Sequence, residues 1–312
     1  MIWGLILMIN SIKLLLTGCT GFLGSFLLKS LTLRSDFKII CLKRSFSDIK
    51  RVSKIDNTNI VYYDIDQVSI DKVFKENKID IVVHAATDYG RNHDSIYQVL
   101  ETNLLFPIKV IELAIQKGVK CFINTDSYFN KENFSYNYLL NYSLSKKNFL
   151  NWLKKLSSKI QIVNIVLEHL YGEYDNPSKF TENVIQKVAI QRVDKMDLTY
   201  GHQRRDFIYI SDVVDAYLTL IEYSVKNRFQ YEVFEIGSGI SYEIRYFCEM
   251  VKKISGSDTL LNYGAVSYRS DEIMESKADI KKISDLGWNP KIKIDEGIKR
   301  IITIYNKADR SK

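Results

Sequence analysis

Short apolar runs alternate with longer segments of helical periodicity along most of the chain. Strands are predicted at the short runs Ile12–Thr17, Lys38–Leu42, Ile60–Tyr63, Ile79–Val83, Cys121–Asn124, Ile160–Leu167 and Val233–Ile236. Helices are predicted where apolar positions recur three and four apart, over Phe22–Leu33, Asp94–Lys117, Tyr138–Leu156, Phe180–Gln191, Asp212–Tyr223, Ser241–Ile254 and Ile294–Tyr305. This alternation predicts an α/β fold built on a parallel sheet.

A glycine-rich turn follows the first predicted strand and opens the first predicted helix. Gly18 permits a tight turn, Gly21 lets backbone amides approach a pyrophosphate at the helix N-terminus, and Gly24 lets helix and strand pack closely. An ordinary glycine-bearing turn is the alternative. The strand–loop–helix context favours dinucleotide binding.

The residues after the second strand bear on which dinucleotide is bound. Lys43 and Arg44 stand where a cofactor with a free ribose hydroxyl usually meets an acid, and the nearby acid is Asp48. Basic residues there favour the 2′-phosphate of NADPH, although a solvated basic loop is the alternative. The third strand ends in Asp64-Ile65, a plausible edge for the adenine ring.

A tyrosine and a lysine lie four residues apart in a predicted helix. Tyr142 and Lys146 therefore share one face, one turn apart, and a neighbouring cation favours ionisation of a phenol. Such a pair can pass a proton to or from a sugar oxygen, whereas the alternative is an amphipathic surface helix. Thr125 ends the fifth strand, where its hydroxyl can bond a substrate carbonyl or simply form a turn.

The amino-acid composition is typical of a globular protein and argues against nucleic-acid binding. The 312 residues are 46% hydrophobic and 26% charged, as in ordinary globular proteins, and the net charge of +7 comes without the arginine-rich blocks of nucleic-acid-binding proteins. Four dispersed cysteines fit buried thiols and a reducing cytoplasm, and four histidines show no metal-ligand spacing. The apolar start Met1–Ile9 lacks a cationic lead and is too short to span a bilayer, with Met8 as a possible true start.

The motifs occur in a recognisable order: TGCTGFLG, HAA at 84–86, Thr125, YSLSK and RRDFIYISDV. Together they resemble the nucleotide-sugar branch of the extended short-chain dehydrogenase/reductase family, over about Ser11 to Ala308. The resemblance implies a doubly wound parallel (Rossmann) sheet with a smaller C-terminal α/β substrate domain. The NADP-binding domain would comprise 8–166 and about 207–236, and the nucleotide-sugar-binding domain about 167–206 and 237–312.

The resemblance also assigns roles. Thr125, Tyr142 and Lys146 would be catalytic. The cofactor would contact Gly18, Thr20, Gly21, Phe22, Leu23, Gly24, Lys43, Arg44, Asp64, Ile65, Ala85, Ala86, Asn103, Tyr142 and Lys146. The nucleotide sugar would contact Thr87, Asp126, Ser127, His169, Lys179, Arg205 and Arg269. No metal is expected, and the family implies a homodimer that acts away from membranes.

The stretches HAATDYG, NTDSYFN, LEHLYG and DVVDAYLT resemble enzymes that reduce the 4-keto group of nucleotide-linked deoxy sugars. This implies NADPH-dependent reduction of a 4-keto-6-deoxy or 3,6-dideoxy sugar for surface polysaccharides. Ser127 replaces the glutamate base of the related dehydratases, which disfavours water elimination. Glu168-His169 replaces the family's usual Phe-Asn, and both a substrate-binding and a structural role are open for His169.

Other functions on this scaffold remain alternatives. A 4-epimerase or 4-dehydrogenase would retain a tightly bound NAD. A non-catalytic cofactor-binding scaffold is less favoured, because such proteins commonly lose the tyrosine or the lysine, and both are present here. The nucleotide base and the configuration at C4 do not follow from the sequence.

Overall fold

The structure is a computed structural model that describes residues 11–55, 58–91, 95–131 and 138–310. The apolar start Met1–Ile9 and the predicted helix start at Asp94 lie outside these residues.

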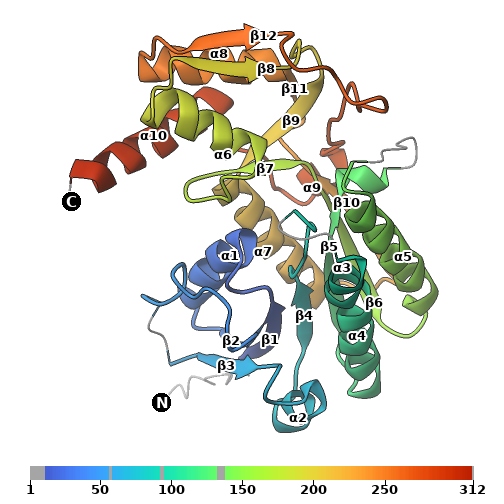
Figure 1. The fold of residues 1–312 in the computed structure, drawn as a ribbon. Helices are drawn as coiled ribbons and strands as arrows, with labels where there is room; N and C mark the ends of the chain where they lie inside the picture. Colours follow the sequence, from blue (N-terminus) through green and yellow to red (C-terminus); the bar gives the residue numbers. More distant parts are fainter. Residues whose placement is uncertain (1–10, 56–57, 92–94, 132–137, 311–312) are drawn as a thin grey trace, which may run out of the picture.

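A seven-stranded parallel sheet forms the centre of the molecule (Figure 1). Its order is β10-β6-β5-β4-β1-β2-β3, and the strands are β1 Ile12–Thr17, β2 Phe37–Lys43, β3 Ile60–Asp64, β4 Ile81–His84, β5 Cys121–Ser127, β6 Gln161–Leu167 and β10 Tyr231–Ile236. The chain reverses its direction of travel across the sheet between β1 and β4, which opens a crevice at the carboxyl ends of the strands. The predicted doubly wound fold is confirmed.

Helices cover both faces of this sheet because its central strands are apolar on both sides. Leu14 and Leu16 of β1 belong to one core cluster with helices α1 (Phe22–Thr32) and α7 (Ile210–Lys226). Leu15 belongs to a second cluster with helices α2 (Ile70–Glu76), α4 (Phe106–Gln116) and α5 (Leu140–Leu156).

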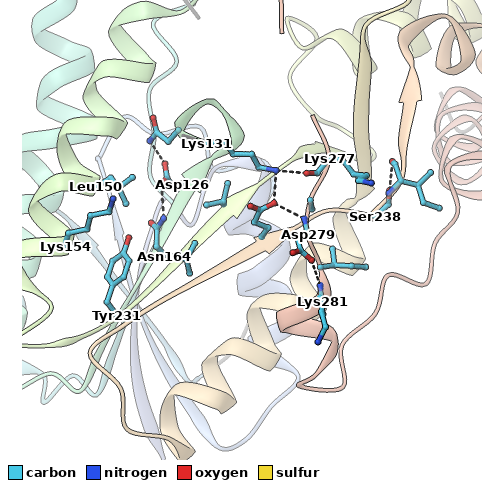
Figure 2. A pocket seen from close by; sticks show the side chains of 18 residues that line it. Asp126, Lys131, Leu150, Lys154, Asn164, Tyr231, Ser238, Lys277, Asp279 and Lys281 are labelled. Atoms are coloured by element: carbon cyan, nitrogen blue, oxygen red, sulfur yellow. Dashed lines mark hydrogen bonds and ion pairs between the residues drawn. The ribbon is translucent and has the colours of Figure 1, made fainter. Parts of the chain in front are cut away.

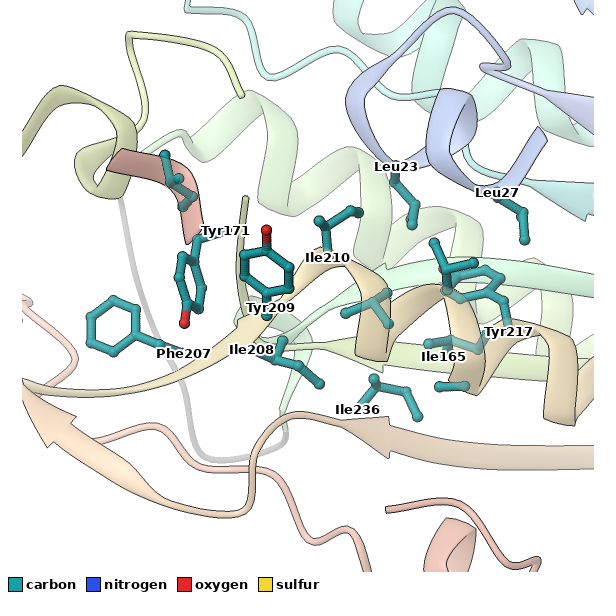
Figure 3. Packing of buried hydrophobic residues seen from close by; sticks show 14 of the residues in the cluster. Leu23, Leu27, Ile165, Tyr171, Phe207, Ile208, Tyr209, Ile210, Tyr217 and Ile236 are labelled. Carbon is teal, nitrogen blue, oxygen red and sulfur yellow. The ribbon is translucent and has the colours of Figure 1, made fainter. Parts of the chain in front are cut away.

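The first of these clusters continues into a second lobe, as Figure 3 shows from Leu23 and Leu27 of α1 through Ile210 and Tyr217 to Phe207. This lobe holds one sheet of β7 (His169–Tyr171), β9 (Arg204–Tyr209) and β11 (Ser241–Glu243), and another of β8 (Lys195–Leu198) and β12 (Leu260–Tyr263). Its helices include α6 (Phe180–Val184), α8 (Ile244–Ser255) and α10 (Ile294–Arg310), whereas α9 (Lys281–Ser284) packs on β10 at the edge of the central sheet.

Two predicted helices contain wide π-helical turns. Helix α3 (Ile96–Leu100) continues through a π-helical segment, η1 (Glu101–Leu105), into α4, and Pro107 lies in the first turn of α4. The helix continues through Pro107, which lies where the π-helical turn passes into α4. The regular i→i−4 bonding is already altered there, since the Phe106 N–H bonds the Glu101 carbonyl. A second π-helical segment, η3 (Ile185–Ile190), follows α6.

Two predicted helix starts are wrong. Strand β9 runs Arg204–Tyr209 and pairs with β7 and β11, and helix α7 begins directly after it at Ile210 rather than at Asp212. Ser241 lies in β11 and does not open α8. In each case strand pairing between distant segments overrides the local pattern.

Candidate active site

The glycine turn has the shape that a pyrophosphate requires. A Cβ on Gly18 would lie 2.6 Å from the backbone nitrogen of Ala86, and one on Gly24 would lie 2.0 Å from the Gly18 carbonyl oxygen. Gly21 precedes α1 and donates its N–H to the Gly18 carbonyl at 2.9 Å. Thr20, Phe22 and Leu23 lie in this turn and the start of the helix, so the backbone can approach a dinucleotide at the N-terminus of α1.

Two alanines after β4 form the other wall of this turn. The N–H groups of Ala85 and Ala86 each lie 3.2 Å from the Thr17 hydroxyl oxygen. That hydroxyl also bonds His84 Nδ1 at 2.8 Å, and His84 is fully buried. His84 is thus a structural residue at the strand end.

The edge predicted to bind the adenosine ribose contains a matched ion pair. Lys43 at the end of β2 bonds the carboxylate of Asp64 at the end of β3, and the Ile65 N–H donates to the Lys43 carbonyl at 2.9 Å. The Arg44 guanidinium lies over the Phe46 ring at 4.8 Å. The residues predicted to contact the ribose phosphate and adenine therefore lie together, but with the charge of Lys43 balanced by Asp64.

Asn103 does not lie in the crevice with these residues. It is buried in η1, donates to the Asp88 carbonyl at 2.7 Å and to the Ser145 hydroxyl at 3.0 Å, and accepts from the Asp88 N–H at 2.7 Å and the Thr87 hydroxyl at 3.2 Å. Its position supports the loop after β4 against α5. Asn103 can therefore act on a ligand through Thr87.

A cavity of about 540 Å³ brings all of the predicted catalytic and substrate residues together. Its lining includes all of Thr125, Tyr142, Lys146, Thr87, Asp126, Ser127, His169, Lys179, Arg205 and Arg269. Strand β5, helix α5, the segment after β6 and the second lobe each contribute part of the lining. The prediction from motif order is therefore consistent with one shared site.

Tyr142 lies in a nearly apolar environment. Its ring stacks on the Tyr89 ring at a centroid separation of 4.7 Å and meets the edge of Phe129 at 6.1 Å. Burial, and then the neighbouring Tyr89, raise the pKa of Tyr142 well above its ordinary value, while a hydrogen bond with the Ser127 hydroxyl opposes this rise. Tyr142 is therefore a neutral phenol at pH 7, the form that can donate a proton.

Lys146 is buried one turn from Tyr142. Its Nζ donates to the Thr125 backbone carbonyl at 2.9 Å. Burial lowers the pKa of Lys146 to about 8, and the nearby Asp126 carboxylate opposes that shift. Among the described residues, no carboxylate forms an ion pair with Lys146.

The two hydroxyls at the end of β5 have different partners. The Thr125 hydroxyl lies 2.6 Å from that of Tyr217 in α7, whereas the Ser127 hydroxyl accepts from the Phe129 N–H at 3.4 Å and acts to lower the pKa of Tyr142. Both residues line the cavity. The Thr125 hydroxyl must therefore share or exchange its bond with Tyr217 to reach a ligand.

Asp126, between them, points to the other face of β5, as alternation along a strand requires. Its carboxylate accepts from the Ser127 N–H at 2.8 Å, Asn130 Nδ2 at 2.7 Å and Asn164 Nδ2 at 3.0 Å, and Figure 2 shows it beside Asn164. Burial raises the pKa of Asp126, and the bond from Asn164 opposes that shift. These three bonds indicate a structural role rather than direct substrate contact.

Arginines line the far end of the cavity. The buried Arg205 pairs with the buried Glu272, and Arg269 lies 3.5 Å from the same carboxylate and over the Tyr138 ring at 3.5 Å. Lys179 pairs with Asp175 at 3.1 Å and lies over the rings of Phe22, at 5.2 Å, and Tyr89. Three cations thus face one cavity, a suitable place for a diphosphate.

The sequence analysis missed Tyr89, Tyr217 and Glu272 as site residues. Tyr89 and Tyr217 stand in the quoted stretches HAATDYG and DVVDAYLT, but neither stretch reveals that one ring stacks on Tyr142 and the other hydroxyl bonds Thr125. Glu272 follows Arg269 by three residues, a spacing that gives an ion pair on one turn and was the available signal.

Three general properties of the described residues bear on the function. No group of three or more His, Cys, Asp or Glu side chains in them is arranged to bind a metal ion. No helix in them combines the length and apolar character needed to cross a bilayer. The four cysteines are unpaired and buried, as predicted for Cys41 and Cys121.

Comparison with known proteins agrees with this arrangement. Residues 14–237 match the model of the NAD dependent epimerase/dehydratase family. CDP-abequose synthase from Salmonella muenchen is 38% identical over 94% of this chain and 97% of its own, and the enzyme of that name from Salmonella typhimurium is 29% identical over 92% and 96%.

Solved structures share the fold at lower identity. UDP-glucose 4-epimerase from Thermotoga maritima, solved with UDP-glucose, has a TM-score of 0.80 at 22% identity, covering 95% of this chain and 99% of that one. UDP-glucose 4-epimerase from Thermus thermophilus, in complex with NAD, has a TM-score of 0.77 at 18% identity, covering 95% and 100%. The protein belongs to the NAD dependent epimerase/dehydratase family, within the extended short-chain dehydrogenases/reductases that act on nucleotide sugars.

Proposed function

We propose that the protein reduces the C4 keto group of a nucleotide-linked 4-keto-6-deoxy or 3,6-dideoxy sugar with NADPH, in the synthesis of sugars for surface polysaccharides. One observation separates this reaction from the dehydrations of the family. In the described part of the chain, each carboxylate that lines the cavity is engaged: Asp126 by asparagines, Glu168 by Lys131 and Ser276, and Glu272 by arginines. Water elimination needs a carboxylate base that these partners do not leave available.

The similarity to CDP-abequose synthase supports the same reaction class. The bound dinucleotide would supply a hydride to C4 of the sugar, and the glycine turn and Lys146 would hold it. Tyr142 would donate its phenolic proton to the C4 oxygen, so that the ketone becomes an alcohol as the nicotinamide is oxidised. Ser127 and Thr125 would place hydroxyls near the developing negative charge, where hydrogen-bond donors accelerate reaction most.

Replacing Tyr142 tests the proposal directly. Tyr142→Phe should reduce kcat for a CDP- or dTDP-4-keto-6-deoxy sugar by about 10²–10⁴-fold, since it removes the proton donor but keeps the ring stacked on Tyr89. Tyr223→Phe, in α7 and stacked on Phe229, is the matched control. Near-normal turnover by Tyr142→Phe, followed as NADPH oxidation, would overturn the role assigned to the phenol.

A 4-epimerase or 4-dehydrogenase with retained NAD is the second candidate, and the Lys43–Asp64 pair favours it. An acid at the ribose edge suits a free 2′-hydroxyl, whereas the predicted preference for NADPH rests on Lys43 and Arg44. Protein that purifies with one equivalent of bound NAD and turns over without added NADPH would decide for this candidate.

We also propose that the protein is a cytoplasmic homodimer. Helix α5 exposes Leu140, Leu144 and Trp152 at 44%, 49% and 49%, a large apolar stripe beside the exposed Ile96 of α3. Sedimentation should give a dimer, which Leu144→Asp dissociates. Leu260→Asp, equally exposed on β12, should leave it intact.

A further inference from the structure

The carboxylate of Glu168 connects the loop after β5 with the C-terminal segment that contains Ser276. Its side chain is fully buried at the end of β6 and bonds Lys131 Nζ at 2.6 Å and the Ser276 hydroxyl at 2.7 Å. Lys131 comes from the loop after β5, and it also bonds Glu235 and the Lys277 carbonyl at 2.7 Å, as Figure 2 shows. Glu168 therefore receives hydrogen bonds from both segments, and these bonds favour its ionised form.

The next residue, His169, lies against this carboxylate. Its Nδ1 is buried, has no hydrogen-bond partner among the described residues, and lies 3.9 Å from Glu168 Oε2. The ring packs against Tyr128 at 4.5 Å and against the edge of Phe207 at 5.9 Å, and it lines the substrate cavity. With Nδ1 directed at Glu168, Nε2 lies on the opposite side of the ring.

The charge states of the two groups follow from their surroundings. Burial alone would raise the pKa of Glu168, but His169 and the charge of Lys131 bring it below its ordinary value. Burial lowers the pKa of His169, and Arg205 adds to this effect while Glu168 opposes it. At pH 7 the carboxylate is ionised and the imidazole is neutral, with a single ring proton.

An ionised carboxylate has only lone pairs to offer, so the proton of a neutral imidazole beside it belongs on the nearer nitrogen. We propose that Glu168 is a positioning residue that fixes His169 as the Nδ1–H tautomer, which presents the Nε2 lone pair to the cavity. The identity of the substrate here rests on the proposed function. His169 then accepts a hydrogen bond from a hydroxyl of the sugar. It does not contact the diphosphate, because the diphosphate oxygens are acceptors too.

This assignment gives the cavity a cationic part and a part that accepts hydrogen bonds. The three cations Arg205, Arg269 and Lys179 take the anionic part of the ligand, and His169 supplies an acceptor for its hydroxyl-bearing part. A phosphate oxygen at Nε2 would bring two lone pairs together. His169 therefore discriminates between sugars by the presence of one hydroxyl.

The tautomer can be observed without any turnover. The chain has four histidines, and protein labelled with ¹⁵N-histidine gives separate Nδ1 and Nε2 shifts, with His169→Asn identifying the signals of His169. Wild type should show a protonated Nδ1 and an unprotonated Nε2. An Nε2–H tautomer, or an imidazolium at pH 7, would overturn the proposal.

Glu168→Gln provides the second arm. The glutamine oxygen can still accept from Lys131 and Ser276, whereas its NH₂ group faces His169 and should move the ring proton to Nε2. Ser276→Ala is the matched control, because it removes a bond to the same carboxylate but leaves the charge, and it should keep Nδ1–H. An unchanged tautomer in folded Glu168→Gln would refute the positioning role.

Kinetics then report on the substrate side. Glu168→Gln should raise KM for the nucleotide sugar about tenfold with a smaller change in kcat and no change in KM for the cofactor, whereas Ser276→Ala should leave the three values near wild type. If Tyr142→Phe keeps its turnover but the tautomer is as expected, the reductase proposal fails and the assignment of His169 stands.

Discussion

The two halves of the cavity differ in the partners of their ionisable side chains. Around Tyr142 and Lys146 the direct partners are uncharged: the Tyr89 ring, the Ser127 hydroxyl and the Thr125 backbone carbonyl, while the Asp126 carboxylate acts from farther away. Around the anion-binding cations the partners are carboxylates, with Glu272 on Arg205 and Asp175 on Lys179. Burial without counter-charges shifts pKa values, whereas pairing keeps a buried cation charged.

The comparison explains why each half is built as it is. A proton donor benefits from a pKa that its surroundings can tune, and Lys146, with a pKa near 8, is poised between its charge states. The binding of a diphosphate requires cations that are charged and held in position before the ligand arrives. The paired carboxylates provide this, and an incoming diphosphate must share or displace them.

The largest effect should come from the uncharged half. Lys146→Met should lower kcat by about 10²–10³-fold, because it removes the cation that can stabilise the Tyr142 phenolate left after proton donation. The exposed neighbour Lys147→Met is the control. Steady-state NADPH oxidation measures both, and equal losses in the two variants would contradict the role of Lys146.

The same half should give the clearest pH dependence. Lys146 carries its charge below its pKa of about 8 and loses it above, so kcat/KM for the cofactor should fall as pH rises through 8. The slope should approach tenfold per pH unit in wild type and vanish in Lys146→Met. A flat wild-type profile from pH 7 to 9.5 would show that the charge state of Lys146 does not matter.

The anion-binding half should respond through KM. Arg205→Lys keeps the charge beside Glu272 but loses the planar fork, whereas a neutral residue would leave Glu272 with the 3.5 Å contact to Arg269 in place of two cations. KM for the nucleotide sugar should rise about tenfold to a hundredfold with little change in kcat. Arg204→Lys, which bonds Ser241 outside the cavity, is the control. A pure kcat loss in Arg205→Lys would break the division between the halves.

The smallest effect concerns cofactor choice. Asp64→Asn removes the counter-charge of Lys43, so the ratio of kcat/KM for NADPH to that for NADH should rise by about three- to tenfold. If the ratio is unchanged while Lys43→Met lowers it, Asp64 does not compete with the ribose phosphate.

The doubly wound sheet and the placing of Tyr142 and Lys146 on one helix face could be predicted because they depend on local signals. The glycine turn follows an apolar strand, and the spacing of Tyr142 and Lys146 fixes their common face. The partners of these residues could not be predicted. Tyr217 reaches Thr125 across 92 residues, and β9 begins at Arg204 because β11 pairs with it. Such long-range contacts leave no periodic signal in the chain.

The wide turn that carries Asn103 makes the site sensitive to the length of the chain there. A π-helical turn holds one residue more than an α-helical turn, and Asn103 reaches both Asp88 and Ser145 from it. Deleting a single residue of Glu101–Leu105 would restore a regular helix and rotate Asn103 by about 100°. Asp88, in the loop before Tyr89, and Ser145, in the helix that carries Tyr142, would then lose their shared hydrogen-bond partner. We expect insertions and deletions in this segment to lower turnover without altering any residue that lines the cavity.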